Sequence, residues 1–348
     1  MLHADVVDGL VDGPELDERL TDPQAALVVA RRRAAARGVA PRHLAGLAVA
    51  RARARRGGPG PVDDADLLVA DVAVRAAAGP RPARTYVPRA GHAGTVLFLH
   101  GGGWALGDLD TDDHLCRALA VQAGVAVVSL AYRLAPEHPF PAGLDDAATV
   151  LGDLADGSFP APAGPLTGPL AVAGAGAGGQ LAALLALHCR RPHTPAVRHQ
   201  LLFCPLLDGD LTRGSHQRYG DGGLGLGVED LAWFWRMYVP DRAARRLPRV
   251  SPLRTPDLTG SVPATVVVAG ADPARDEGLA YARALREAGT RCRPVLVEGV
   301  PHGFAGDPEL AAGERAVRAA AEHLRATFDA PRVVDLRDRQ PVSARQPF

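Results

Sequence analysis

The chain has 348 residues, 47% of them hydrophobic, and its 39 basic and 39 acidic side chains give a formal net charge of zero. This length and hydrophobic content suffice for one large globular domain or two small ones. A zero net charge provides no long-range field to attract nucleic acid or an acidic membrane. No apolar segment reaches about 18 residues without polar interruption, and the N-terminus lacks a basic stretch followed by an apolar run. We expect a cytoplasmic protein that binds neither nucleic acid nor membrane.

Lysine, isoleucine and asparagine do not occur in the chain. Their codons are rich in A and T, so their absence indicates the GC-rich genome of a bacterium. The four cysteines are widely separated and show neither a C-x-x-C pair nor a zinc-binding spacing. We predict free thiols in a reducing compartment, with no metal and no cofactor; the cysteines are Cys116, Cys189, Cys204 and Cys292.

The first 57 residues are expected to be helical, because Ala, Leu and Val recur at helical spacing through residues 23–37 and 41–56. A Gly- and Pro-rich segment at 57–61 ends this region. The last 18 residues are charged, contain proline and lack clear periodicity, so we expect them to be mobile or docked on the surface. The predicted organisation is N-terminal cap helices at 1–57, a main domain at 58–328 and a tail at 329–348.

From residue 67 onwards, apolar segments typical of strands alternate with helical patterns. Strands are expected at 67–74, 95–100, 125–132, 170–173, 200–204, 264–269 and 294–297. Helices are expected at 110–122, 144–154, 179–188 and 278–288. The alternation predicts a mostly parallel sheet covered by helices on both faces, with ligands bound beyond the carboxyl ends of the strands. The insertion at 208–248 is too long for a simple crossover and is expected to cap the site, its aromatics lining a pocket or packing the cap.

Residues with chemical potential follow several predicted strands. The segment H-G-G-G-W at 100–104 places three glycines after a strand, where backbone N–H groups can approach a substrate oxygen closely. Asp272 and His302 follow later strands, and a histidine oriented by a carboxylate is the base of many acyl-transfer sites. The glycine-rich segment 174–180 lies between a predicted strand and a predicted helix.

These motifs resemble the hormone-sensitive-lipase-like family of α/β-hydrolases, which includes bacterial carboxylesterases. The resemblance runs in the family's order from about residue 65 to 325. Its further motifs are at 132–142, 145–146, 251–253, 272–273, 276–278 and 302–304. It implies an α/β-hydrolase fold with a mostly parallel central sheet and a helical cap built from the N-terminal helices and the insertion, and it also implies a homodimer.

The resemblance also assigns roles to residues of this chain. It makes His302 the catalytic base and Asp272 the acid that orients it. The N–H groups of Gly102, Gly103 and Ala177 correspond to the oxyanion hole. Two further residues, Trp104 and Ala175, are expected in the substrate pocket.

The chain departs from the family at the turn that carries the nucleophile. The family's segment reads G-D-S-A-G-G-N, whereas this chain has Ala175, Gly176 and Gln180 in place of the aspartate, serine and asparagine. Gly176 therefore stands where the serine nucleophile is expected. The spacing G-x-G-x-x-G also matches a dinucleotide-binding turn. That motif needs an acidic residue about 20 positions later, where this chain has Arg190 and Arg191, so nucleotide binding is disfavoured.

Three functions remain open for a site without the serine. In the first, His302 and Asp272 act as a general acid/base pair on a small, largely apolar carbonyl or ester compound, such as one of specialised metabolism. The reaction is an elimination, cyclisation, isomerisation or water-mediated hydrolysis. Retention of both residues favours this hypothesis. In the second, the protein is a pseudo-hydrolase that binds a small ligand. In the third, it is an esterase with a relocated nucleophile such as Cys204 or a hydroxyl of the cap.

Overall fold

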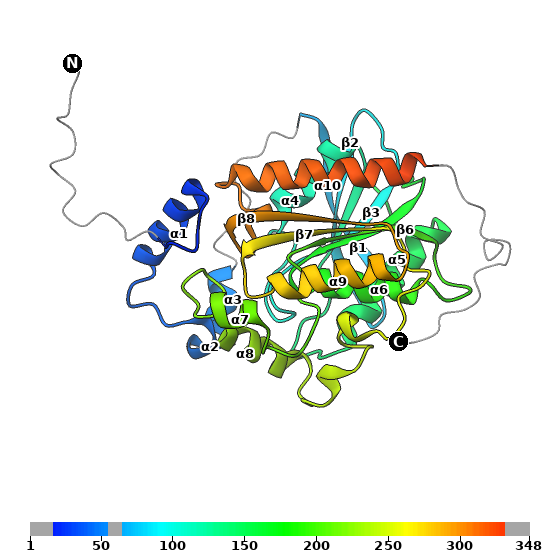
Figure 1. Ribbon diagram of the computed structural model, residues 1–348. Helices are drawn as coiled ribbons and strands as arrows, with labels where there is room; N and C mark the ends of the chain where they lie inside the picture. The colour runs from blue at the N-terminus through cyan, green and yellow to red at the C-terminus, as the bar shows by residue number, and fades with distance from the viewer. Residues whose placement is uncertain (1–16, 55–64, 331–348) are drawn as a thin grey trace, which may run out of the picture.

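A computed structural model describes residues 17–54 and 65–330 (Figure 1). The predicted Gly- and Pro-rich boundary at 57–61 and nearly all of the predicted tail at 329–348 lie outside the described residues.

The described residues form one eight-stranded sheet of order β1-β2-β4-β3-β5-β6-β7-β8. The strands are β1 (Leu67–Ala76), β2 (Gly79–Pro88), β3 (Thr95–Leu99), β4 (Ala126–Leu130), β5 (Leu170–Ala175), β6 (Val197–Phe203), β7 (Ala264–Ala271) and β8 (Cys292–Pro301). The pairs from β4 through β8 are parallel, whereas β2 is antiparallel to both β1 and β4. The predicted, mostly parallel sheet is confirmed.

The sequence patterns did not predict β2, because Pro80 and Pro82 interrupt its first half. In the structure this half pairs with β1, and the ladder with β4 begins at Ala83, next to a hydrogen bond from the Ala131 N–H to the Pro82 carbonyl. The two prolines are two positions apart, so their nitrogens, which have no hydrogen to donate, face the same side, away from β1. They are therefore tolerated in a strand that lies inside the sheet.

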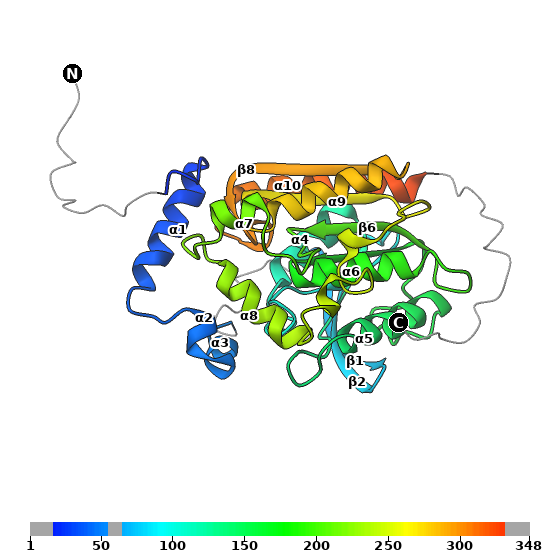
Figure 2. The ribbon, with the colours of Figure 1, turned by 60° about the horizontal axis from the view of Figure 1, so that its bottom comes forward.

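Helices cover both faces of the sheet (Figures 1 and 2). One face carries α4 (Asp113–Ala123) and α10 (Ala311–Asp329), and the other carries α5 (Ala142–Asp156), α6 (Ala177–His188) and α9 (Arg275–Glu287). Alternation along β3 divides its side chains between two apolar cores: Val96 and Phe98 face α4 and α10, whereas Leu97 and Leu99 face the opposite layer. The predicted helices included four of these five and omitted α10.

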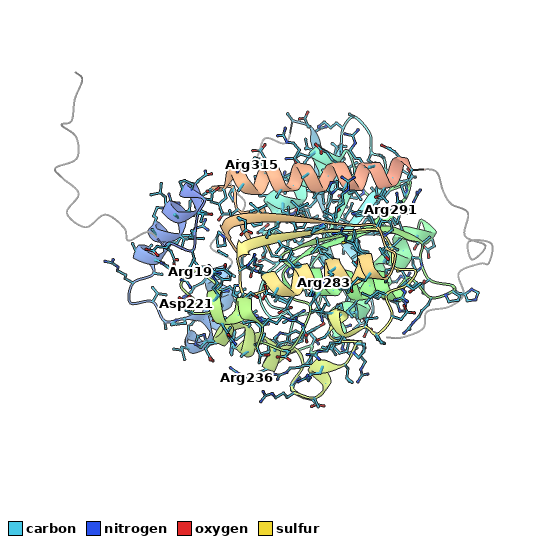
Figure 3. The ribbon with its side chains drawn as sticks, in the orientation of Figure 1. Arg19, Asp221, Arg236, Arg283, Arg291 and Arg315 are labelled. Atoms are coloured by element: carbon cyan, nitrogen blue, oxygen red, sulfur yellow. The ribbon has the colours of Figure 1, made fainter. Side chains whose placement is uncertain are left out.

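The N-terminal helices and the insertion lie together at one side of the sheet (Figure 2). They comprise α1 (Pro23–Ala35), α2 (Arg42–Ala45), α3 (Leu47–Ala54), α7 (Gly214–Tyr219) and α8 (Val228–Tyr238). The helix predicted at 41–56 is divided at Gly46, whose φ of +82° ends α2. Polar contacts join the two segments: Arg19 pairs with Asp221 at 2.9 Å, side by side in Figure 3, and His43 lies 2.8 Å from Asp230.

Within the two described ranges, none of the helices combines the length and apolar character that crossing a lipid bilayer requires.

A substitution at Gly178 tests how closely α6 approaches β3. A Cβ at this position would overlap the Leu99 carbonyl oxygen, a backbone atom that cannot rotate away. We expect Gly178→Ala to lower the free energy of unfolding by about 3 kcal/mol, measured as a lower urea midpoint at unchanged slope. The control is Gly152→Ala in α5, where a Cβ meets nothing within 4 Å. It should stabilise the protein by about 0.5–1 kcal/mol, and equal stability of the two variants would contradict the packing described.

Candidate functional site

A cavity of about 870 Å³ lies beyond the carboxyl ends of the central strands. Its walls come from the segments that follow β3, β5, β6 and β8 and from the N-terminal helices and the insertion. The sequence-predicted residues among its lining are Gly102, Gly103, Ala175, Gly176, Ala177 and His302. Segments far apart in the sequence therefore meet in one space.

The sharpest turn of this site lies between β5 and α6. Gly176 connects them with φ +51° and ψ −113°, in the region that disfavours residues with a side chain. Its N–H donates to the Phe203 carbonyl at 2.9 Å, and its carbonyl accepts from the N–H of Leu206 at 3.1 Å. A Cβ at position 176 would lie 3.3 Å from His302 Nε2. This position therefore faces the histidine directly.

His302 and Asp272 form a hydrogen-bonded pair. Each is the first residue after a strand, β8 and β7 respectively, and the distance from Nδ1 to Oδ2 is 2.8 Å. The N–H of Ala274 donates to the other oxygen of the buried Asp272 carboxylate, also at 2.8 Å. This arrangement fixes the imidazole so that Nε2 faces Gly176.

The charge environment favours a protonated His302. Burial lowers the pKa of His302, but the negative charge of Asp272 and the hydrogen bond to it raise this pKa, and the net result lies above the ordinary histidine value. The positive charge of Arg42 opposes the rise, and the negative charge of Asp112 adds to it. A base with this environment is neutral only above the usual histidine range.

The glycine loop presents free N–H groups to the cavity. Gly102 and Gly103 have φ angles of +107° and +60°, and among the described residues no acceptor binds their N–H groups. The Gly102 carbonyl is turned back to accept from Leu106 N at 2.9 Å. Ala177 is the first residue of α6, where an N–H has no acceptor within the helix. These three donors can stabilise negative charge on a substrate oxygen.

Trp104 does not lie where the pocket prediction placed it. Its φ is +60°, and its indole is buried and stacked on Tyr238 with ring centroids 4.4 Å apart. The indole N–H donates to Gln180 Oε1 at 3.1 Å. Phe234 lines the cavity instead, whereas Trp235 and Tyr238 pack the cap. The predicted pocket residue is therefore a core residue, and only one of these three aromatic residues of α8 reaches the cavity.

Two further lining residues carry groups with chemical potential, and the sequence analysis considered only one of them. Asp112 was not singled out among the four aspartates that follow the glycine loop, because their spacing does not distinguish the one that faces the cavity. Cys204, considered as a relocated nucleophile, also lines the cavity and has φ +43°. Burial raises the pKa of its thiol, and the charge of Asp272 raises it further, so the thiol stays protonated.

Cys204, Asp272 and His302 offer possible metal-ligand atoms within 4.8 Å of one another. The histidine and aspartate atoms facing each other are already joined by their hydrogen bond. The predicted absence of a metal stays a prediction.

Comparisons with known proteins agree with this geometry. A family model described as an alpha/beta hydrolase fold matches residues 96–306. The chain is 40% identical over 257 residues to the carboxylic ester hydrolase LipN of Mycobacterium tuberculosis, covering 71% of this chain and 67% of that protein. It is 41% identical over 211 residues to an ethyl acetate hydrolase of Pseudomonas putida, covering 60% and 65%.

Solved structures show the same likeness over more of the chain. A thermostable esterase from Pseudomonas putida superposes with a TM-score of 0.78 at 28% identity, covering 92% of this chain and all of that one. A hyperthermophilic esterase from Pyrobaculum calidifontis also has a TM-score of 0.78, at 33% identity, covering 86% and 97%.

Replacement of the Asp272 carboxylate tests its electrostatic role. Asp272→Asn removes the negative charge that raises the pKa of His302 and leaves burial, which lowers it, so we expect this pKa to fall. The measurement is an NMR titration of the His302 ring signals in both proteins. The ring signals of the solvent-exposed His138 serve as the internal control. A His302 pKa equal in both proteins would contradict the assigned cause.

Proposed function

The chain belongs to the α/β-hydrolase family, and on this premise we propose that it is a His–Asp general acid/base enzyme that hydrolyses a small, largely apolar ester with water as the attacking nucleophile. Several of the relatives are named as ester hydrolases. Elimination, cyclisation or isomerisation of a carbonyl compound would use the same pair of residues.

One observation carries the proposal: Gly176 offers only a hydrogen atom where a Cβ would stand 3.3 Å from His302 Nε2. In our interpretation this glycine replaces the serine nucleophile, and the space released holds about one water molecule. The imidazole and its Asp272 partner keep the geometry of a general base, with a 2.8 Å hydrogen bond on the far side of the ring. A water bound at Nε2 is then the group that loses a proton.

In the proposed reaction, Nε2 of His302 takes a proton from this water while the water oxygen bonds to the ester carbonyl carbon. The negative charge that develops on the carbonyl oxygen is stabilised by the N–H groups of Gly102, Gly103 and Ala177. Asp272 stabilises the imidazolium that forms. The carbon–oxygen bond to the alcohol then breaks as the leaving oxygen gains one proton, the imidazolium gives up the proton that it took, and carboxylic acid and alcohol leave. No covalent acyl-enzyme forms along this route.

The cavity walls support a small apolar substrate. The lining beside the pair is mainly aliphatic and aromatic; it includes Leu106, Leu115, Phe203, Leu206, Leu224, Leu226 and Phe234. Charged side chains there engage one another, as in the pairs of Arg32 with Asp307 and His43 with Asp230. An uncharged acyl chain fits such walls better than a charged one.

Two other functions are less well supported. A relocated nucleophile at Cys204 conflicts with burial and the Asp272 charge, which keep its thiol protonated. A protein that only binds a ligand has no need of a base held by a buried carboxylate, and both His302 and Asp272 are present. A ligand recovered unchanged from the purified protein, without any ester turnover, would favour binding.

Removal of the proposed base provides the direct test. We expect His302→Gln to lower kcat for p-nitrophenyl butyrate by about 10²–10⁴-fold, because the water loses its proton acceptor. The control is His138→Gln, an exposed histidine outside the large cavity, which should retain activity. Turnover by His302→Gln at the native rate would remove the proposed base from the mechanism.

Substitutions at Gly176 separate the two nucleophiles. Gly176→Ala fills the proposed water position without adding a hydroxyl, so we expect turnover to fall at least about 10-fold. Gly176→Ser fills the same space but places a hydroxyl near His302, and we expect a burst of p-nitrophenol from acyl-enzyme formation. Rapid-mixing absorbance and intact-protein mass spectrometry detect both results. A native protein that itself shows the burst would contradict direct attack by water.

A further inference from the structure

Asp112 is a carboxyl group of the cavity that the proposed reaction has not used. It lies just before α4, and its Oδ2 accepts a 2.7 Å hydrogen bond from the Gly101 N–H at the start of the glycine loop. Its Oδ1 lies beside Gly306, on the segment that follows His302. Among the described residues, no hydrogen bond occupies this second oxygen. Asp112 therefore has one oxygen fixed and one available in a cavity that it shares with His302.

The surroundings of Asp112 favour the neutral carboxyl. Burial raises the pKa of Asp112, and the hydrogen bond from Gly101 and the charge of His302 only partly oppose it. The carboxyl therefore holds its proton at higher pH than an ordinary aspartate.

Few other titratable groups interact electrostatically with Asp112. Those on which it acts, besides His302, are the Cys116 thiol on α4 and the Tyr132 hydroxyl, and burial raises the pKa of both well above their usual values. Asp113, the next residue in the chain, forms ion pairs with Arg84 and Arg117. Among these groups, His302 and Asp112 are the imidazole and the carboxyl that line the cavity.

Direct attack by water can use two such groups. In a serine hydrolase one imidazole takes the proton of the nucleophile and then gives it to the leaving group. When water attacks the ester itself, the entering and leaving oxygens are likewise bound to one carbon, and Nε2 of His302 faces the position of the entering oxygen. A second acid at the leaving oxygen supplies the proton of the alcohol without a change of contact at the imidazole.

Resting on the proposed function, we infer that Asp112 is the general acid of this site, donating the proton on its free oxygen to the leaving alcohol. His302 takes one proton from water as the new carbon–oxygen bond forms. The old carbon–oxygen bond breaks as its electron pair accepts the proton of Asp112. The products are carboxylic acid and alcohol, and a proton passes from the His302 imidazolium to the Asp112 carboxylate through solvent to restore both groups.

The test compares two esters with the same acyl group. Ethoxide needs a proton to leave, whereas p-nitrophenolate leaves as a stable anion. Asp112→Asn keeps an oxygen for the Gly101 N–H but carries no acidic proton. We expect its kcat to fall about 100-fold on ethyl butyrate and by a much smaller factor on p-nitrophenyl butyrate. An unchanged thermal unfolding midpoint shows that the variant is folded.

The pH profile of the native protein gives a second readout that needs no variant. Activity on both esters should rise as His302 loses its proton. Activity on ethyl butyrate alone should fall again at higher pH, where Asp112 loses its proton.

The outcomes of these experiments distinguish the inference about Asp112 from the proposed function on which it rests. An equal loss on both esters in Asp112→Asn would assign the residue to positioning of the glycine loop and overturn the inference. Unchanged ethyl butyrate activity in the variant, or a native profile without the fall at higher pH, would overturn it as well. In each case p-nitrophenyl turnover that depends on His302 leaves the proposed function intact. A native protein that hydrolyses neither ester overturns both proposals.

Discussion

Six neighbouring strands run parallel, so their carboxyl ends meet at one edge of the sheet, and each segment that follows adds a different group to one cavity. The segment after β3 provides free N–H groups, that after β5 provides the sharp turn, and those after β7 and β8 provide the acid and the base. A change of register in any of these pairs would move its group by several ångströms. The chemistry of the site therefore depends on backbone pairing far below the cavity.

The strands and the positions that follow them could be predicted because the signals are local. Apolar runs of four to eight residues mark buried strands, and polar residues after them lie at the edge where ligands bind. His302 and Asp272 follow two such strands, the resemblance to the family assigned their roles, and the structure places them 2.8 Å apart. The strand β2 was not predicted, because prolines are tolerated in a strand only where the pairing does not need their N–H groups, and only the tertiary structure shows where that is.

Side-chain direction was less predictable than position. Trp104 follows the glycine loop as the motif requires, but its positive φ turns the indole into the core against Tyr238. Asp112 is one of four nearby aspartates, and only the tertiary structure shows which one contacts the loop. Gln180 similarly finds its partners, Trp104 and the Val250 carbonyl, on segments distant in sequence. Such contacts depend on packing between elements, which no local pattern encodes.

The junction between α1 and the insertion differs in kind from the core beneath it. Among the described residues, a small apolar cluster that includes Leu20, Val29 and Leu224 joins the two, together with charged and polar contacts such as that between Arg19 and Asp221. Ion pairs at partly exposed positions weaken as dissolved salt screens them, whereas apolar contacts do not. This wall of the cavity is thus held in part by contacts that respond to ionic strength, unlike the apolar cores on the two faces of the sheet.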